Sequence, residues 1–139
     1  MTRRPPPDLV LAVARKITGT PGADWASSWA RAATFLTRSA LEDAVDLLWT
    51  GPLTPLTSCP RSTQLLCLPT YLNDPDLARK VHSTWAQLSN ACHAHAYDLD
   101  PTISELNGWI DTVQKFIHAL AGGAGPATVL TDRAAVEAL

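Results

Sequence analysis

Apolar residues recur at helical spacing over the second half of the chain. Two runs alternate steps of four and three residues, which is the heptad spacing of a helix that packs along one seam. Two such helices, residues 75–97 and 102–121, joined by a short connection, predict an antiparallel hairpin. The first seam comprises Val81, Trp85, Leu88, Cys92, His95 and Leu99, and the second comprises Ile103, Leu106, Ile110, Val113, Ile117 and Leu120.

Helix-start signals precede both segments. Asn73 or Asp74 can cap the first helix, and Pro75 suits a first helical position because its missing N–H has no intrahelical partner there. Thr102 and Glu105 have the spacing of a capping box. The sequence therefore predicts where both helices begin, and residues 98–102 are expected to separate them.

Two further helices are expected in the first half. Asp8 can cap residues 9–17, with Leu9, Val13 and Ile17 as the inward stripe. Asp24 can cap a helix over residues 24–49. Its expected inner face is Trp25, Trp29, Ala32, Ala33, Leu36, Leu41, Val45 and Leu48. Ser39 and Glu42 form a second capping-box pattern, so two helices with a kink near Arg38 are the alternative to one long helix.

The remaining segments complete a helical architecture. Residues 51–60 contain three prolines, which predicts a loop. Residues 61–68 are predicted to form a short helix that ends at Pro69. We expect an all-α fold, an antiparallel (up-down) four-helix bundle with a short extra helix. Residues 1–7 form an extended N-terminal arm, residues 8–121 the bundle and residues 122–139 a flexible C-terminal tail.

Composition points to contact with another chain. Hydrophobic residues make up 46% of the 139 residues and charged residues only 17%, and five tryptophans are present. Aromatic side chains dominate interface energetics. Trp109 and Phe116 flank the second seam, and together with Trp49 they are the predicted interface anchors of a homo-oligomer or of a complex with a partner protein.

Charge and cysteine content exclude several classes. A net charge of −2 disfavours binding to nucleic acid, which needs a basic excess. No apolar run is long enough for a membrane span. Three cysteines without a scaffold pattern indicate reduced thiols and a cytoplasmic protein. Phosphate-binding glycine motifs are absent, so no cofactor is expected.

Reactive side chains gather between residues 88 and 99. Cys92 and His95 share one helix face, and with Cys67 or Cys59 alongside they could supply sulfur and nitrogen ligands to zinc. The alternative is structural: Cys92 packs as a small apolar residue, and His95 is a hydrogen-bonded group of the core. Because metal-ligand motifs such as CxxC do not occur, we favour the structural interpretation and predict no metal site.

The segment W-x-x-L-S-x-x-C-H-x-H-x-Y-x-L-x-P-T-x-x-E-L, residues 85–106, is similar to one in small helical proteins of actinobacteria. Over about residues 24–120 the helix layout resembles the HEPN superfamily. That resemblance implies a ribonuclease that uses Asn90 and His95, but its motif needs an arginine where this chain has Ser89. A basic residue from elsewhere, such as Arg79 or Arg61, would have to replace it.

Three functions are therefore carried forward. The favoured one is a non-enzymatic helical-bundle interaction module that dimerises or binds a partner protein. The HEPN resemblance implies a setting in bacterial conflict or toxin–antitoxin systems. The alternatives are a HEPN-type ribonuclease that acts on RNA with His95, Asn90 and Arg79, and a zinc-binding helical protein.

Overall fold

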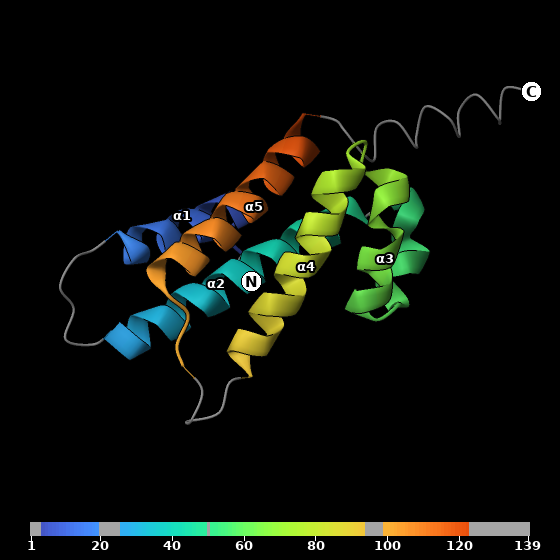
Figure 1. Cartoon of the computed structure of the whole chain (residues 1–139). Helices are drawn as coiled ribbons and strands as arrows, with labels where there is room; N and C mark the ends of the chain where they lie inside the picture. Colours follow the sequence, from blue (N-terminus) through green and yellow to red (C-terminus); the bar gives the residue numbers. More distant parts are fainter. Residues whose placement is uncertain (1–3, 20–25, 50, 94–98, 123–139) are drawn as a thin grey trace, which may run out of the picture.

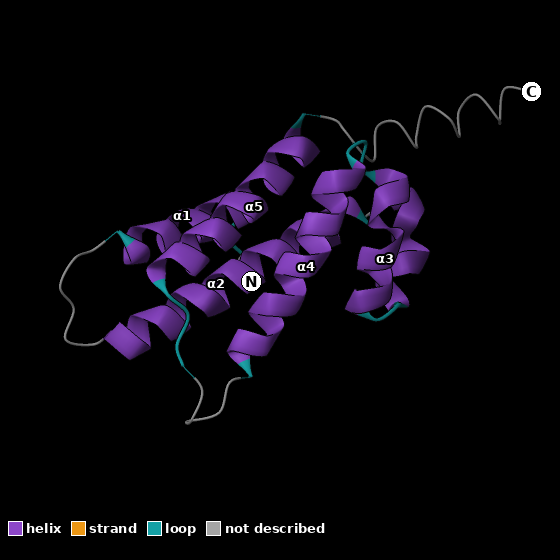
Figure 2. Cartoon of the chain, in the orientation of Figure 1, coloured by secondary structure: helices purple, strands orange, loops and turns teal. Residues whose placement is uncertain are grey.

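The computed structural model describes residues 4–19, 26–49, 51–93 and 99–122, and all regular structure in these ranges is helical (Figures 1 and 2). This confirms the all-α prediction. The expected cap at Asp24, Trp25, His95, Tyr97 and the tail lie outside the described residues. The elements are α1 (Pro7–Thr18), α2 (Ala26–Leu48), the 3-10 helix η1 (Gly51–Ser58), α3 (Arg61–Tyr71), α4 (Pro75–Cys92) and α5 (Ile103–Ala121).

Helix α2 is the longest element, with 23 residues, and it packs against α1, α4 and α5. Figure 1 shows α1 and α5 side by side along one part of α2, whereas α3 lies beyond α4 at the other end of the molecule. Helices α4 and α5 also contact each other, as the predicted hairpin requires. None of the described helices is long and apolar enough to cross a membrane.

The predicted starts of α4 and α5 are confirmed. The Asp74 carboxylate accepts a hydrogen bond of 3.1 Å from the Leu77 backbone N–H, and Pro75 occupies the first turn of α4. At α5 the Thr102 hydroxyl accepts a 3.1 Å bond from the Glu105 N–H, while the Glu105 carboxylate accepts a 2.8 Å bond from the Thr102 N–H. Each side chain satisfies a backbone donor that the helix itself leaves without a partner.

The end of α4 was predicted wrongly. The helix stops at Cys92 and not near residue 97, and the His93 N–H turns back onto the carbonyls of Ser89 and Asn90, each at 3.2 Å. Leu99, the last member of the predicted seam, is 96% exposed. The first four seam members, Val81, Trp85, Leu88 and Cys92, all lie on α4, whereas Leu99 lies beyond the end of the helix. Apolar spacing does not reveal where a helix stops.

The inward stripe of α1 was predicted wrongly for Leu9 and Val13, whereas Ile17 is half-buried and packs against a cluster of buried residues as expected. Leu9 and Val13 are 54% and 45% exposed, whereas Leu11 and Ala14 are buried. Residues 9–14 are all apolar, so the spacing does not distinguish one face of this helix from another. Hydrogen bonds fix the orientation instead, because Arg15 and its neighbours face α5.

Helix α2 is continuous, so the kink near Arg38 and the capping box at Ser39 and Glu42 do not occur. Ala33, Leu41, Val45 and Leu48 are buried as predicted, but Ala32 is exposed. Thr34 and Thr37 are buried instead, and each hydroxyl donates a 2.7 Å hydrogen bond to the carbonyl four residues earlier. Those bonds let polar side chains lie in the core without an unsatisfied donor.

Two proline segments behave differently from the prediction. Residues 51–58, expected as a loop, form η1. Pro69 lies inside α3, which continues to Tyr71 and did not end at residue 68. Pro69 has no N–H to donate to the Leu65 carbonyl, so α3 lacks that hydrogen bond and continues for only two more residues.

The capping box gives a test of the boundary of α5. We expect Thr102→Ala to lower the free energy of unfolding by about 1 kcal/mol, because the Glu105 N–H loses its acceptor. Urea denaturation followed by circular dichroism measures it. Thr70→Ala, at an exposed threonine of α3, is the control and should change the free energy little. Equal effects of the two substitutions would contradict the capping role.

Candidate functional site

Two of the three predicted interface anchors lie in the core. Trp49 and Phe116 have no exposed surface, and neither can contact a second chain in this fold. The Trp49 ring meets the Tyr71 ring edge-on, with centroids 5.3 Å apart and planes at 84°. The Trp49 Nε1–H has no hydrogen-bond partner. Trp49 therefore contributes by packing.

Trp109, the third anchor, is half-buried and joins two parts of the molecule. Its ring packs against the main core and against the small cluster of Ala30, Ala33 and Leu106. Its indole Nε1–H donates a 2.6 Å hydrogen bond to the Gln87 Oε1 on α4. Through these contacts Trp109 stabilises the packing of α5 against its neighbours within one chain.

The structure does not bring together the described residues of the ribonuclease alternative. Arg79 is in the first turns of α4 and forms an ion pair with Asp76, whereas Asn90 is in the last turn of α4. A helix rises about 1.5 Å per residue, so these two residues lie about 16 Å apart along the axis. Arg61, the other proposed cation, is on α3, and its guanidinium donates to Asp46. His95 lies outside the described residues.

The zinc alternative also lacks a described site. Cys67 is on α3, Cys92 ends α4, and both are half-buried free thiols, as is Cys59. Among the residues that the structure describes, no three histidine, cysteine, aspartate or glutamate side chains are grouped so as to hold a metal ion.

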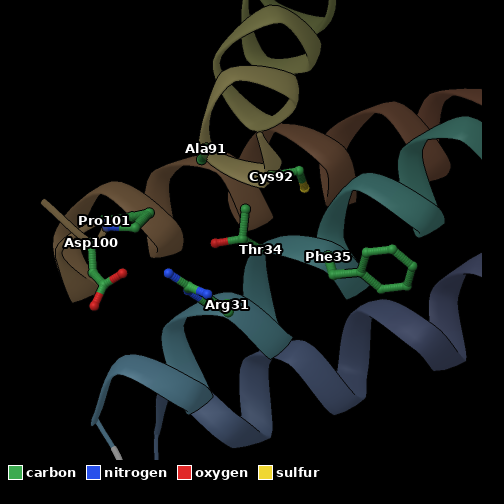
Figure 3. A pocket seen from close by; sticks show the side chains of 7 residues that line it. All are labelled: Arg31, Thr34, Phe35, Ala91, Cys92, Asp100 and Pro101. Atoms are coloured by element: carbon green, nitrogen blue, oxygen red, sulfur yellow. The ribbon is translucent and has the colours of Figure 1, made fainter. Parts of the chain in front are cut away.

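A small pocket of about 200 Å³ lies beside the end of α4 (Figure 3). Arg31 and Asp100 are at one side of it, and Cys92 and Phe35 are at the other, with the Phe35 ring turned away. A guanidinium and a carboxylate therefore both line this pocket. Its lining residues come from α2, α4 and the segment before α5: Arg31, Thr34, Phe35, Ala91, Cys92, Asp100 and Pro101.

The acidic residues of α2 form part of an ordered charge cluster. The Glu42 carboxylate accepts hydrogen bonds from Arg38 at 2.9 Å and from the Trp85 indole at 3.3 Å. Arg61 on α3 lies 3.9 Å from the same carboxylate and bonds to Asp46 at 2.7 Å. The cluster thus ties α2 to α3 and α4. Only the four-residue spacing of Arg38 and Glu42 could have been recognised in the sequence.

Asp43 lies beside the N-terminal segment, in a setting that perturbs its pKa. Its carboxylate lies 3.0 Å from the Arg4 guanidinium. Burial raises the pKa of Asp43, the nearby carboxylates of Asp46 and Glu42 raise it further, and the charge of Arg4 lowers it. The N-terminal segment therefore compensates part of the cost of placing a carboxylate here.

Large apolar side chains remain exposed on α1 and α2. Leu9 and Val13 are on α1, and Phe35 and Leu47, which are 62% and 57% exposed, are on α2. Beside Leu47 is an apolar groove of about 390 Å³ between the start of α1 and the ends of α2 and α5. It is lined by Pro6, Pro7, Asp8, Ala44, Leu47, Leu48, Ile117, Leu120 and Ala121.

Comparison with known proteins found no matching family model, no similar curated protein and no similar solved structure.

Truncating Trp109 tests its structural role. We expect Trp109→Ala to lower the free energy of unfolding by about 3 kcal/mol, because packing against two clusters is lost. Trp109→Phe, which keeps an aromatic ring and removes the bond to Gln87, should cost about 1 kcal/mol. Urea denaturation measures both. Unchanged stability together with a smaller sedimenting mass would instead identify Trp109 as an interface residue.

Arg4→Ala should raise the pKa of Asp43 further, because the cation that lowers it is removed. A raised native pKa means that the folded chain binds this proton more tightly than the unfolded chain. The stabilisation from this proton is complete below the unfolded pKa and is lost as pH rises through the folded pKa.

Titration of the Asp43 side-chain carbon by NMR measures this shift. Arg79→Ala, which removes a cation paired with Asp76, is the control and should leave the Asp43 titration unchanged. An Asp43 pKa that falls or stays constant in Arg4→Ala would contradict the assignment.

Proposed function

We propose that this chain is a non-enzymatic helical interaction module that self-associates or binds a partner protein. The observation that carries the proposal is the set of large apolar side chains exposed on α1 and α2: Leu9, Val13, Phe35 and Leu47. Scattered apolar residues are normal on protein surfaces, but several on adjoining elements favour a contact surface.

The orientation of α1 turns Leu9 and Val13 away from the core. Arg15 points to α5, where it bonds to Asp111 and Gln114. At about 100° per residue, Leu9 and Val13 lie about 120–160° around the helix from Arg15, so they face away from α5. Figure 1 shows α1 running antiparallel to α2, which places Phe35 and Leu47 on the adjoining helix.

The finer features of the proposal rest on the sequence. They are an antiparallel up-down four-helix bundle with a short extra helix, a cytoplasmic location and a role in bacterial conflict or toxin–antitoxin systems. The last comes from the HEPN resemblance and stays a prediction. The ribonuclease alternative has no support from the placement of Arg79 and Asn90, which lie at opposite ends of α4.

Sedimentation equilibrium tests the proposal. We expect the wild-type chain to sediment as an oligomer at micromolar concentration. A variant with serine at Leu9, Val13, Phe35 and Leu47 should sediment as a monomer with largely unchanged helicity, because these side chains are exposed and are not among the fully buried residues of the core.

Serine at Leu66 and Ile103, which are exposed on α3 and α5, provides the matched control and should leave the oligomer intact. Loss of the oligomer in the control alone would contradict the surface on α1 and α2. A wild-type monomer at every concentration would contradict self-association.

A further inference from the structure

The apolar groove beside Leu47 opens where α5 ends. Its volume is about 390 Å³, and its walls come from the start of α1, the end of α2 and the last turns of α5. Leu47 is exposed, and Ile117 and Leu120 are half-buried, so apolar surface remains uncovered there. Ala121, the last residue of α5, is itself part of the wall. Gly122, at which the described range 99–122 ends, therefore lies next to the groove.

The lining of the groove defines the chemistry of its occupant. Eight of its nine lining residues are proline, alanine, leucine or isoleucine. The ninth is Asp8, which is exposed in the first turn of α1 and has no ion-pair partner within the described part of the chain. A matching segment therefore offers uncharged aliphatic side chains to the groove and, beyond them, a cation that can approach Asp8.

Residues 127–131 of this chain have that composition. Their sequence is A-T-V-L-T, in which Val129 and Leu130 are adjacent aliphatic residues and no residue is charged. Arg133, the only lysine or arginine after Lys115, follows two positions later. Segments that remain in solvent are poor in apolar residues, whereas eight of the thirteen residues 127–139 are alanine, valine or leucine. This part of the chain therefore carries apolar surface that it can bury.

The covalent connection selects this segment over a separate molecule. Eight residues lead from Ala121 to Val129, and a chain of that length spans at most about 29 Å when it is fully extended. Residues 122–126 are G-G-A-G-P, and glycine permits the backbone conformations that a reversal of chain direction needs. A segment tethered this closely is present at an effective concentration on the order of millimolar, so even a weak apolar contact forms within one chain.

We propose that residues 127–131 fold back over the end of α5 and occupy this groove in the same chain. Val129 and Leu130 cover Leu47 and its apolar neighbours, and Arg133 lies near Asp8. The inference goes beyond the proposed function, because it concerns a contact within one chain. Leu47 belongs to the apolar surface proposed above for self-association or a partner protein. A partner that uses Leu47 therefore has to displace this segment, which acts as a competitor built into the chain.

Paramagnetic broadening of NMR signals in the full chain tests the docked position. A nitroxide is attached at Thr131→Cys, in a background with alanine in place of the three native cysteines that is first shown to keep its helicity. We expect the amide signals of Asp8 and of residues 44–48 to lose intensity, because these residues belong to the groove and are remote in sequence from the label. Residues 28–32, about 24 Å away along α2, should keep theirs.

Two aspartate substitutions in the nitroxide-labelled chain test which residues dock. Leu130→Asp removes an aliphatic side chain and would place a second carboxylate in an apolar groove that already contains Asp8. We expect it to restore the signal intensity of Asp8 and of residues 44–48. Ala138→Asp, which adds the same charge outside the docked residues, is the matched control and should leave the intensity loss unchanged.

A mixed sample distinguishes contact within one chain from contact between copies. It contains isotope-labelled chain without nitroxide and nitroxide-labelled chain without the isotope. Intensity loss at Asp8 and residues 44–48 in the doubly labelled chain, but not in the mixture, supports the proposal. The same loss in the mixture overturns it, because the segment then reaches a second copy. Absence of the loss, or a loss that Leu130→Asp leaves unchanged, also overturns it. Sedimentation tests self-association separately, so either proposal can fail without the other.

Discussion

Burial of the inner face of α2 is the interaction on which the other helices depend. Helices α1, α4 and α5 all pack against it. Its buried positions alternate small and large side chains, with alanines that allow close approach and leucines that fill the space between helices. The hydroxyls of Thr34 and Thr37 on this face donate hydrogen bonds to backbone carbonyls of α2, so neither buried hydroxyl lacks a hydrogen-bond partner. The fully buried apolar members are Ala30, Ala33, Ala40, Leu41, Ala44, Val45 and Leu48.

The side of α2 that faces away from this core is organised by charge. Arg38 and Glu42 pair along the helix, and Arg61 from α3 joins them between Glu42 and Asp46. The Trp85 indole on α4 donates to the same Glu42 carboxylate. The Glu42 carboxylate thus accepts hydrogen bonds from Arg38 on α2 and from Trp85 on α4. It also lies close to the Arg61 guanidinium on α3. The polar rim of α2 therefore helps to set the position of α3 and α4, in addition to the apolar core.

Local sequence signals were sufficient to predict where helices begin. They were not sufficient to predict which face of a helix is buried or where the helix ends. Asp74, Thr102 and Glu105 act within one turn, so their capping roles could be predicted from spacing. The inward face of α1 depends on where α5 lies, which residues 9–14 do not encode by themselves. Trp49 and Phe116 were placed at an interface because aromatic residues dominate interfaces, but the same property makes them suitable for a core. The charge cluster joins residues from separate elements, and only its contacts within α2 have a visible spacing.

Because α1, α4 and α5 all pack against α2, the fold depends on one element. A chain that loses α2 loses the contacts of three other helices together. If the exposed apolar side chains of α1 and α2 form the contact surface proposed above, association would act as a ligand of the folded state, and mass action would add to its stability as protein concentration rises. Unfolding and dissociation would then form one coupled equilibrium, and a dilute chain would be easier to unfold than a concentrated one.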